Sequence, residues 1–462
     1  MPRTCAHVAV QWMAAPDTTV EVNGEPAPDG IWRATLEGDE ASFEIRAQRG
    51  KQEPVVYTLH VTRESGEWTE EYLKTEAPVA GDRFGGSLAL RRNTLVVGSP
   101  DSDKYRGSAY IYSFVSSAWQ LDAIKHPPDT IEAKPAEVDT HHNFGRSVAV
   151  DEAGQRVLIG SNQQDAYLFV HNGMSWEQVA VIRTGGHAVA IDGDTIAASV
   201  PWGKEEASVR IHERASDGSW QEAMRIVGAL GTAFGGALAL HRNTLVVGEE
   251  AAEQGGSADA GAAHVYHKRD GRWSDHGEAL QHPPHGYDYF GMAVAIDPDY
   301  IVVGAPGRDS ARPPEGFAGH NNGAVLIYDR HTLALLKEIE LREAEQPEAN
   351  CFGRSVDLAD GRLLVGATDY DGSLATSADC HHHGGTGRGF LYYSVEDAIA
   401  GAEPVALAPA GLESGDLAGY RIAASGPHVA VSAPREDGAG QGFGGERSDN
   451  SAEDSGTVYL FR

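Results

Sequence analysis

One motif recurs along this 462-residue chain and constrains its fold more than any other feature. Phe-Gly begins a run of small residues, a turn rich in Asn, Asp and Gly follows, and a β-branched run then ends in Gly-Ala-Pro or a variant of it. Internal repetition of this kind predicts a solenoid, a propeller or an array. Five clear copies and two divergent ones begin at Phe84, Phe144, Phe234, Phe290, Phe352, His187 and Tyr420.

Each copy predicts four strands. Short alternating runs bounded by Gly, Asn, Asp and Pro are typical of β-strands. The motif supplies two such runs, an aromatic-rich run follows, and a fourth run often opens with Trp, as at Trp119 and Trp176. Four evenly spaced strands form one blade of a β-propeller, so the repeats predict an all-β, seven-bladed β-propeller. An open array of hairpins is the alternative, but it would leave an exposed sheet edge.

The two ends of the repeat region predict a closed ring. The last copy stops at Arg462 after three strands. Residues 67–77, EWTEEYLKTEA, have the Trp-first pattern of a fourth strand, with Trp68 in the leading place. We expect this segment to complete the last blade, because that pairing removes the final exposed edge.

Phe-Gly followed after about a dozen residues by Val-Gly-Ala-Pro resembles the FG-GAP repeat. That repeat builds the seven-bladed propeller head of integrin α subunits and of many bacterial cell-surface proteins. The resemblance covers roughly residues 67–462. It implies the fold more strongly than the function, because function depends on sites added to a fold.

The family often carries a calcium loop of the Asp-x-Asp-x-Asp-Gly type between the first two strands, and this sequence departs from that pattern. The turns RRNT and HRNT contain no acid. Asp192 with Asp194, and Asp297 with Asp299, give two carboxylates each, which suits hairpin turns better than a calcium site. We therefore expect no cofactor, and calcium is an alternative that these short turns do not support.

Residues 1–65 have a different character. Candidate strands are separated by APD, EPAPDG and RGKQEP, and Phe43, Ile45 and Ala47 alternate with period two. The run from TTVEVNG to YTLHVTR resembles the bacterial cadherin-like β-sandwich family. Its opening strand matches poorly, so the domain is either truncated or begins upstream of Met1. The predicted organisation is a small N-terminal β-sandwich over 1–65 and a propeller over 66–462, closed by the 67–77 strand.

Charge and hydropathy narrow the range of partners. The formal net charge of −30 disfavours nucleic acid and anionic membrane surfaces as partners. The sequence contains no apolar stretch long enough to span a membrane and no visible signal peptide. Because the resemblance is to surface modules, we expect an extracellular or cell-surface location, as a monomer or as part of a larger multidomain chain.

Two cysteines belong to one repeat. Cys351 precedes the Phe-Gly of the sixth copy, and Cys380 lies in the loop after its second strand. Those two places share one face of the ring, so a Cys351–Cys380 disulfide is one interpretation, and it would require an oxidising compartment. Two free thiols are the other. Cys5 is left over near the start of the chain.

The loop that contains Cys380 also offers two weak metal candidates. His381 and His383 belong to a run of three histidines, and imidazole suits zinc, copper and nickel. Asp369 and Asp371 lie in DYDG, but two carboxylates are few for calcium. Ligands from one short stretch do not converge from different directions, so we favour a solvated loop and a turn.

The loops after the second strands are the predicted binding surface. They lengthen along the chain and project from one face together with the connections between blades, and such loops on a rigid scaffold commonly carry function. Exposed aromatic and charged side chains tend to anchor partners, although each can instead pack its own loop. The candidates, of which Trp202 and Tyr370 are the strongest, are Tyr105, Trp202, Arg308, Phe317, Tyr370 and Phe443.

No catalytic motif is present in the sequence. We therefore expect a non-enzymatic extracellular binding or adhesion module that recognises a protein or a glycan through the long-loop face. One alternative is a carbohydrate-active enzyme on the same face or in the central channel, which would need convergent carboxylates. Another is a structural spacer of a larger surface protein.

Overall fold

The structure is a computed structural model, and two compact units make up the chain. It describes residues 7–11, 17–27, 31–35, 40–62, 68–128, 142–162, 165–183, 185–200, 207–274, 276–308, 322–341, 351–368 and 385–462. The first unit comprises residues 1–68 together with 360–363 and 392–405, and the second comprises the rest. The predicted all-β class is confirmed, since the described residues form strands and two short helices, α1 (Ser102–Tyr105) and α2 (Val395–Ala400).

The repeats form seven antiparallel sheets in the described part of the chain. The first sheet is β8 (Ser87–Arg91), β9 (Thr94–Ser99), β10 (Ser108–Val115) and β11 (Ala118–Lys125). The second is β12 (Ser147–Val150), β13 (Arg156–Gly160), β14 (Asp165–His171) and β15 (Trp176–Arg183). The third is β16 (Val189–Asp192), β17 (Thr195–Val200), β18 (Ser208–Arg214) and β19 (Trp220–Val227). The fourth is β20 (Phe234–His241), β21 (Thr244–Glu249), β22 (Ala262–Arg269), β23 (Arg272–Trp273) and β24 (Glu278–Ala279).

The remaining three sheets follow the same order. The fifth is β25 (Ala293–Ile296), β26 (Tyr300–Ala305), β27 (Ala324–Asp329) and β28 (Leu335–Ile339). The sixth is β29 (Phe352–Ala359), β30 (Arg362–Ala367), β31 (Arg388–Tyr392) and β32 (Val405–Leu407). The seventh is β33 (Ile422–Ser425), β34 (His428–Ala433), β35 (Thr457–Phe461) and β7 (Glu70–Leu73).

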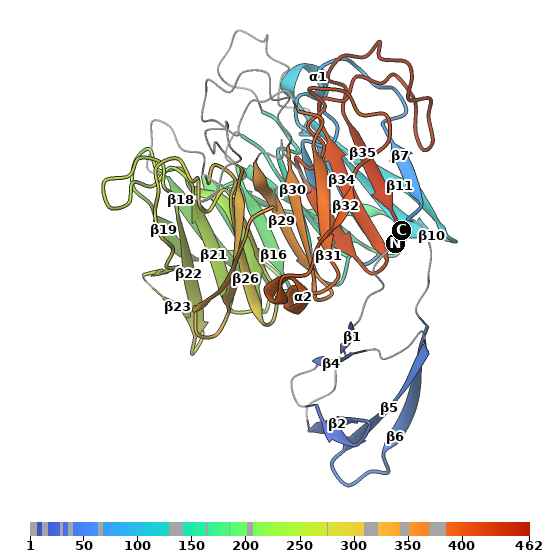
Figure 1. The fold of residues 1–462 in the computed structure, drawn as a ribbon, viewed down its shortest axis with the longest axis vertical. Coiled ribbons are helices and arrows are strands. Elements are labelled where there is room, and N and C mark those ends of the chain that lie inside the picture. The colour runs from blue at the N-terminus through green and yellow to red at the C-terminus, as the bar shows by residue number, and fades with distance from the viewer. Residues whose placement is uncertain are drawn as a thin grey trace. The chain divides into compact units, whose positions relative to one another are not determined.

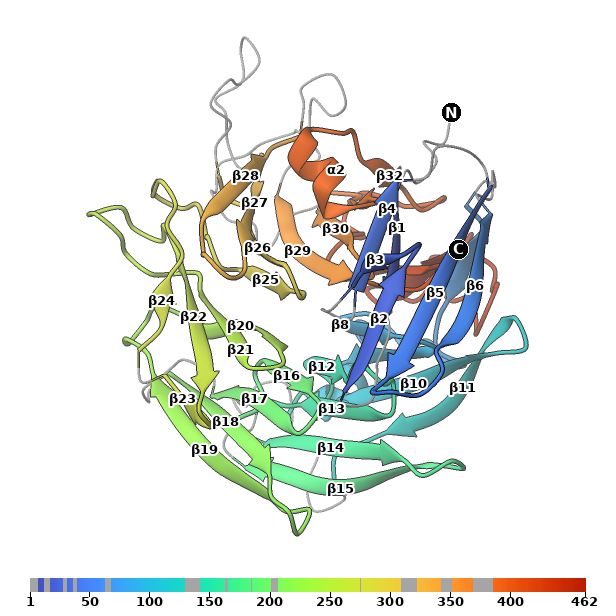
Figure 2. The same cartoon turned by 90° about the horizontal axis from the view of Figure 1, so that it is seen from below.

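The first strands of these sheets surround a common axis. Each contacts the first strand of the next sheet, in the order β8, β12, β16, β20, β25, β29 and β33, and β33 contacts β8 again. Figure 2 shows β8, β12, β16, β20, β25 and β29 around this axis. The sheets therefore form a closed β-propeller, and we call each sheet a blade.

The last blade is completed by the strand that precedes the first one. β7 lies within the predicted 67–77 segment and pairs with β35, with Leu73 opposite Val458 (Figure 1). The buried Lys74 follows this strand, and its Nζ lies 2.7 Å from the Glu436 carboxylate in the seventh blade. Tyr72 donates a hydrogen bond to the same carboxylate at 2.9 Å. The N-terminal and C-terminal ends of the propeller are thus joined by strand pairing and by a buried ion pair.

Close contact between neighbouring blades explains why the motif contains glycine at two positions. A Cβ added at Gly98, in the Gly-Ala-Pro position of the first blade, would lie 2.0 Å from the carbonyl oxygen of Gly145, in the Phe-Gly of the second. Real Cβ atoms do not approach backbone that closely. Phe-Gly and Gly-Ala-Pro are therefore the two halves of one contact between neighbouring blades. The same contact recurs between Gly304 and Gly353.

This contact corrects the start of the two divergent copies. Gly160 approaches Gly186 as Gly98 approaches Gly145, and Gly366 approaches Gly419 in the same way. The Phe-Gly equivalents are therefore 185–186 and 418–419, two residues before the predicted starts at His187 and Tyr420. The signal was missed because Gly185 and Ala418 stand where the clear copies have Phe.

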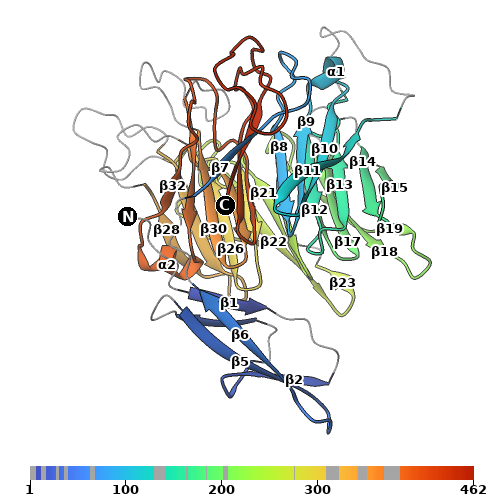
Figure 3. The same ribbon diagram turned by 90° about the vertical axis from the view of Figure 1, so that its right-hand side faces the viewer.

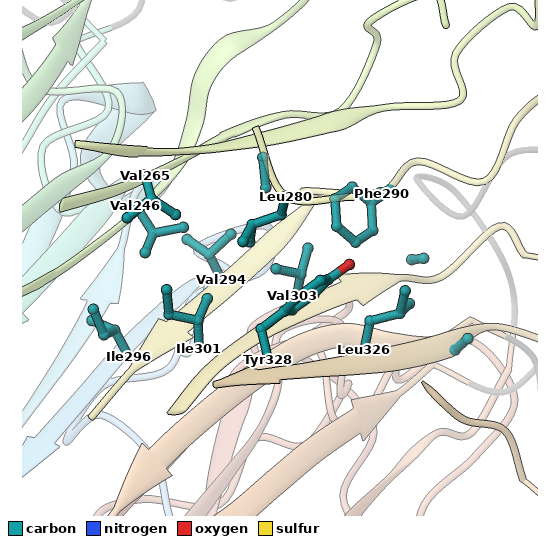
Figure 4. Packing of buried hydrophobic residues seen from close by; sticks show 13 residues of the cluster. Val246, Val265, Leu280, Phe290, Val294, Ile296, Ile301, Val303, Leu326 and Tyr328 are labelled. Carbon is teal, nitrogen blue, oxygen red and sulfur yellow. The ribbon is translucent and has the colours of Figure 1, made fainter. Parts of the chain in front are cut away.

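The core lies between neighbouring blades. Figure 4 shows one such interface, in which Val246 and Val265 of the fourth blade face Phe290, Val294 and Val303 of the fifth, all buried. Second strands such as β9 and β26 are buried along most or all of their length. The mid-strand residues of β8, β12 and β20 are in contrast part-exposed, although these strands lie nearest the axis. Solvent therefore reaches these three strands, whereas β33 is buried along its whole length.

The N-terminal unit has two antiparallel sheets. One contains β3 (Glu25–Pro26), β2 (Thr18–Val22), β5 (Glu40–Arg49) and β6 (Val55–Thr62), and the other pairs β1 (His7–Gln11) with β4 (Ile31–Thr35). Asn23 and Gly24 have φ of 51° and 82°, as a two-residue hairpin turn requires. The buried Val20, Val22 and Phe43 form the apolar side of the larger sheet.

Candidate functional site

The predicted binding face is the end of the propeller at which each first strand begins. Ser87, at the start of β8, pairs with Gly98, near the end of β9, so the Phe-Gly residues and the loops after the second strands share that end. We call it the FG face. The opposite end carries the turns between first and second strands, and we call it the turn face. In Figure 3, α1 follows β9 at the FG face.

Most of the predicted loop candidates lie outside the described residues and stay predictions. This holds for the aromatic candidates Trp202, Phe317 and Tyr370 and for the metal candidates Asp369, Asp371, His381 and His383. Among the residues that the structure describes, no group of three His, Cys, Asp or Glu side chains is placed to hold a metal ion.

Tyr105 is half-buried in the loop after β9. Its φ is 65°, and Asp103 and Lys104 have φ of 48° and 55°, so α1 is one left-handed turn. Residues other than glycine adopt that conformation at a cost of about 1 kcal/mol each. The turn is held in place because the amide of Asn143 donates to the Tyr105 carbonyl at 2.9 Å and the Asn143 side chain donates to Asp101 at 2.9 Å.

Arg308 is buried and its guanidinium is occupied by protein groups. Its Nη1 lies 2.8 Å from Asp288 and 3.0 Å from the Pro283 carbonyl, and its Nε pairs with Glu338. The charge that made this residue a candidate therefore stabilises the fifth blade. Phe443 remains 38% exposed, but its ring packs edge-on against Tyr112 at 5.8 Å.

Cys351 is buried and disulfide-bonded. Cys5 and Cys380 both lie outside the described residues, so the predicted pairing with Cys380 stays a prediction. Two of the turn aspartates contact a neighbouring blade, since Asp192 accepts from the amide of Arg242 and Asp194 pairs with Arg156, whereas Asp297 has a local role. Asp297 accepts hydrogen bonds from the amides of Asp299 and Tyr300 at 2.8 and 2.7 Å, which is the predicted hairpin-turn chemistry.

A cluster that the sequence analysis missed lies around the axis at the FG face. It comprises Arg146, His187, Arg354, Tyr420 and Arg421, and we call it the arginine cluster. The first four occupy one repeat position, directly after Phe-Gly or its equivalent. In the other blades that position holds Gly86, Gly236 and Met292.

Tyr420 is the centre of the cluster. The guanidinium carbons of Arg354 and Arg421 lie 4.5 and 4.7 Å from the centroid of its ring. The Arg146 Nη2 atom lies 3.0 Å from the Nε2 atom of His187. Stacking on an aromatic face is a common arrangement for guanidinium groups and leaves their N–H edges available.

The electrostatics show that the cluster spans the axis. Burial raises the pKa of Tyr420, but the charges of Arg354, Arg421 and Arg146 outweigh that effect and lower it to about 8. Burial, followed by the charges of Arg146 and Arg421, lowers the pKa of His187 to about 3. His187 belongs to the third blade and Arg421 to the seventh, which are not neighbours. Their side chains therefore interact across the centre of the ring.

One signal in the sequence could have found this cluster. Reading the repeat position after Phe-Gly down the seven copies gives Gly, Arg, His, Gly, Met, Arg and Tyr once the divergent copies are aligned by their glycines. Equivalent positions of a propeller lie at one level around its axis. Two arginines at that level are a visible basic feature in a chain of net charge −30.

The comparisons agree with the fold. A model of the FG-GAP repeat matches residues 75–112 and 284–328, which contain strands of the first and fifth blades. No curated protein matches the chain. Within the described residues, no helix has the length and hydropathy that crossing a bilayer requires.

Proposed function

We propose that this chain is a non-enzymatic binding module of the adhesion type, which recognises a protein or a glycan at the FG face. In this proposal the propeller is a seven-bladed, integrin α-like head, the N-terminal unit is a cadherin-like β-sandwich, and both belong to an extracellular or cell-surface protein. The FG-GAP match supports the propeller part, because that repeat forms a non-catalytic type of propeller.

The arginine cluster is the observation that carries the proposal. Side chains from the second, third, sixth and seventh blades converge on the axis at the face that also carries the long loops. Charged and aromatic groups gathered on a rigid scaffold are typical of binding sites. The closed ring supplies that rigidity, since β7 pairs with β35 and leaves no open end.

A carbohydrate-active enzyme is the runner-up. Glycosidases of the common type need two carboxylates that flank the scissile bond. The negative charge of Glu250 acts on Arg421, which indicates that one carboxylate lies near the arginine cluster. The enzyme would therefore require a second acid at the FG face, and turnover of a glycan found to bind would distinguish it from the binding module.

A glycan-array screen and a pull-down from extracellular extracts test the proposal together. We expect a specific glycan or protein to bind the purified full chain, with loss in Trp202→Ala or Tyr370→Ala. Met174→Ala is the matched control, because Met174 is 91% exposed in a hairpin at the opposite end of the second blade. Absence of any specific partner in both screens, with and without calcium, would contradict the binding function and leave the spacer.

A further inference from the structure

We propose that the arginine cluster is an oxyanion-binding site at the FG end of the propeller axis, which takes a carboxylate, sulfate or phosphate group. Nothing in the fold or in the family match assigns a ligand to these residues. The inference deepens the proposed function and rests on it in one respect: a macromolecular ligand would present its acidic group at this point of the FG face.

Unneutralised charge is the first argument. Across the described residues, Arg91, Arg308 and other arginines form ion pairs with carboxylates, whereas Arg146, Arg354 and Arg421 form none. The chain has 67 acidic and 37 basic residues other than histidine, so carboxylates to pair with them are abundant. Like charges placed together repel unless a counter-ion joins them. Arg421 experiences the charge of Glu250 but forms no ion pair with it, so the convergence of the three arginines indicates a site for a counter-ion from outside the chain.

The burial of Arg354 is the second argument. This residue is 7% exposed, yet in the described residues its side chain contacts the Tyr420 ring and hydroxyl group rather than a carboxylate. A buried cation without an anionic partner is strongly unfavourable. An anion against the guanidinium edge would supply the missing partner. Because the aromatic ring covers the guanidinium face, the N–H donors along the edge stay available for that contact.

Access and geometry are the third argument. Arg146 is exposed, and Tyr420 and Arg421 are part-exposed, so a small ion can reach the cluster from solvent. Arg421 donates one N–H to the Tyr420 carbonyl at 3.0 Å, and Arg146 donates one to His187. In the described residues, the other N–H groups of these two side chains have no protein partner. Guanidinium forks match the paired oxygens of carboxylate, sulfate and phosphate.

The potential at Tyr420 supports the same conclusion. A phenol surrounded by protein normally ionises less readily than in water. Here the surrounding guanidinium groups reverse that tendency and lower the pKa to about 8. The site therefore stabilises a negative charge on an oxygen atom, which is the property that an oxyanion ligand uses.

Calorimetric titration of the full chain tests the inference. The probes are sulfate, inorganic phosphate, acetate and glucuronate, each at millimolar concentration and constant ionic strength against chloride. We expect saturable binding of one ion by the wild type and binding weaker by about tenfold or more in Arg146→Gln and in Arg421→Gln. Arg156→Gln is the matched control, because that arginine lies on the turn face in an exposed pair with Asp194.

The outcomes separate this inference from the proposed function. Preference for glucuronate would identify an acidic sugar as the source of the group, and preference for sulfate or phosphate a free or esterified inorganic anion. No saturable binding by any probe, or equal binding in the Arg146→Gln variant and the wild type, would overturn the site. A glycan or protein partner that binds Arg146→Gln normally would support the proposed function and contradict the inference. Ion binding without any macromolecular partner would do the reverse.

Discussion

The two ends of the propeller axis differ in whether carboxylates neutralise their arginines. At the turn face, Arg91 of the first blade forms a two-pronged pair with Asp357 of the sixth, at 3.1 and 3.3 Å. At the FG face, Arg354 lies only three residues before Asp357 on the same strand and forms no such pair in the described residues. One strand therefore contributes to a neutralised end and to an end that retains its charge.

The turn face satisfies its buried cations with protein groups. Arg330 is 9% exposed and donates to the carbonyls of Asp297 and His241, each at 3.1 Å, and to Thr244 at 3.0 Å. Arg354 is about equally buried and lacks an equivalent set. Buried arginine therefore stabilises the fold at the turn face, whereas in our account it forms part of a ligand-binding site at the FG face.

We expect the largest loss of folding stability from Asp357→Ala. The substitution removes the acceptor for Arg91 and for the amide of Ala424, which donates to Asp357 at 2.9 Å. The substitution takes the carboxylate away from the half-buried Arg91 and from a buried amide, so we expect about 3 kcal/mol of destabilisation by urea unfolding. Asp194→Ala, in an exposed pair, should cost less than about 1 kcal/mol. Equal losses in the two variants would contradict the assignment of the turn face as an internally neutralised end.

Ionisation of Tyr420 should change folding stability and sulfate affinity by a smaller amount. Its pKa is about 8 in the folded protein and 10.0 in a free tyrosine, so the folded state releases this proton first. The resulting stabilisation is complete above pH 10, grows between pH 8 and 10, and is absent below pH 8. The phenolate also offsets one guanidinium charge, so sulfate affinity should fall about fivefold to tenfold as pH rises through 8.

The test is a sulfate titration at several pH values in wild type and in Tyr420→Phe. The variant should bind sulfate with an affinity that does not change across that range. A fall in affinity of the same size in Tyr420→Phe would place the titrating group elsewhere and weaken the case for the arginine cluster.

Replacing Arg354 by leucine at the FG face should change stability less than replacing the half-buried Arg91 at the turn face. Arg354→Leu removes an unpaired buried cation, so stability in anion-free buffer should stay within about 1 kcal/mol of wild type. Arg91→Leu leaves Asp357 without its cation and should cost about 3 kcal/mol. Added sulfate should raise the thermal unfolding temperature of the wild type and of Arg91→Leu but not that of Arg354→Leu. A large loss in Arg354→Leu would show that this arginine is structural after all.

The smallest effect is expected from His187. Burial, with the charges of Arg146 and Arg421, lowers its pKa to about 3, so the imidazole stays neutral between pH 7 and 5. Sulfate keeps its charge over that range, and its affinity should therefore change less than twofold. An affinity that rises steeply on acidification, and does not rise in His187→Gln, would show that the imidazole becomes charged and serves as a fourth cation.

The fold was largely predictable because its determinants are local and repeated. Gly98 and Gly145 mark where two blades touch, and the same glycine pair recurs where Gly248 meets Gly291 and Gly304 meets Gly353. The closing strand was visible because Trp68 opens a fourth-strand pattern in front of the first repeat. Gly185 and Ala418 disguised the divergent starts, since Phe is absent there.

The candidate site was not predictable in the same way. Arg308 resembled a loop ligand, but its partner Asp288 lies twenty residues away and only the fold brings the two side chains together. The arginine cluster draws on four blades, so its members are scattered between Arg146 and Arg421 in the sequence. Each arginine is one charge within its own repeat, and the convergence of the side chains depends on the closure of the ring.

The most direct test of the contrast between the two ends is a crystal soaked in selenate, a tetrahedral oxyanion with an anomalous signal. The account predicts an anomalous peak on the axis within hydrogen-bond distance of Arg354 and Arg421, and none beside Arg91 and Asp357. An empty arginine cluster, or a peak at the turn face instead, would contradict it.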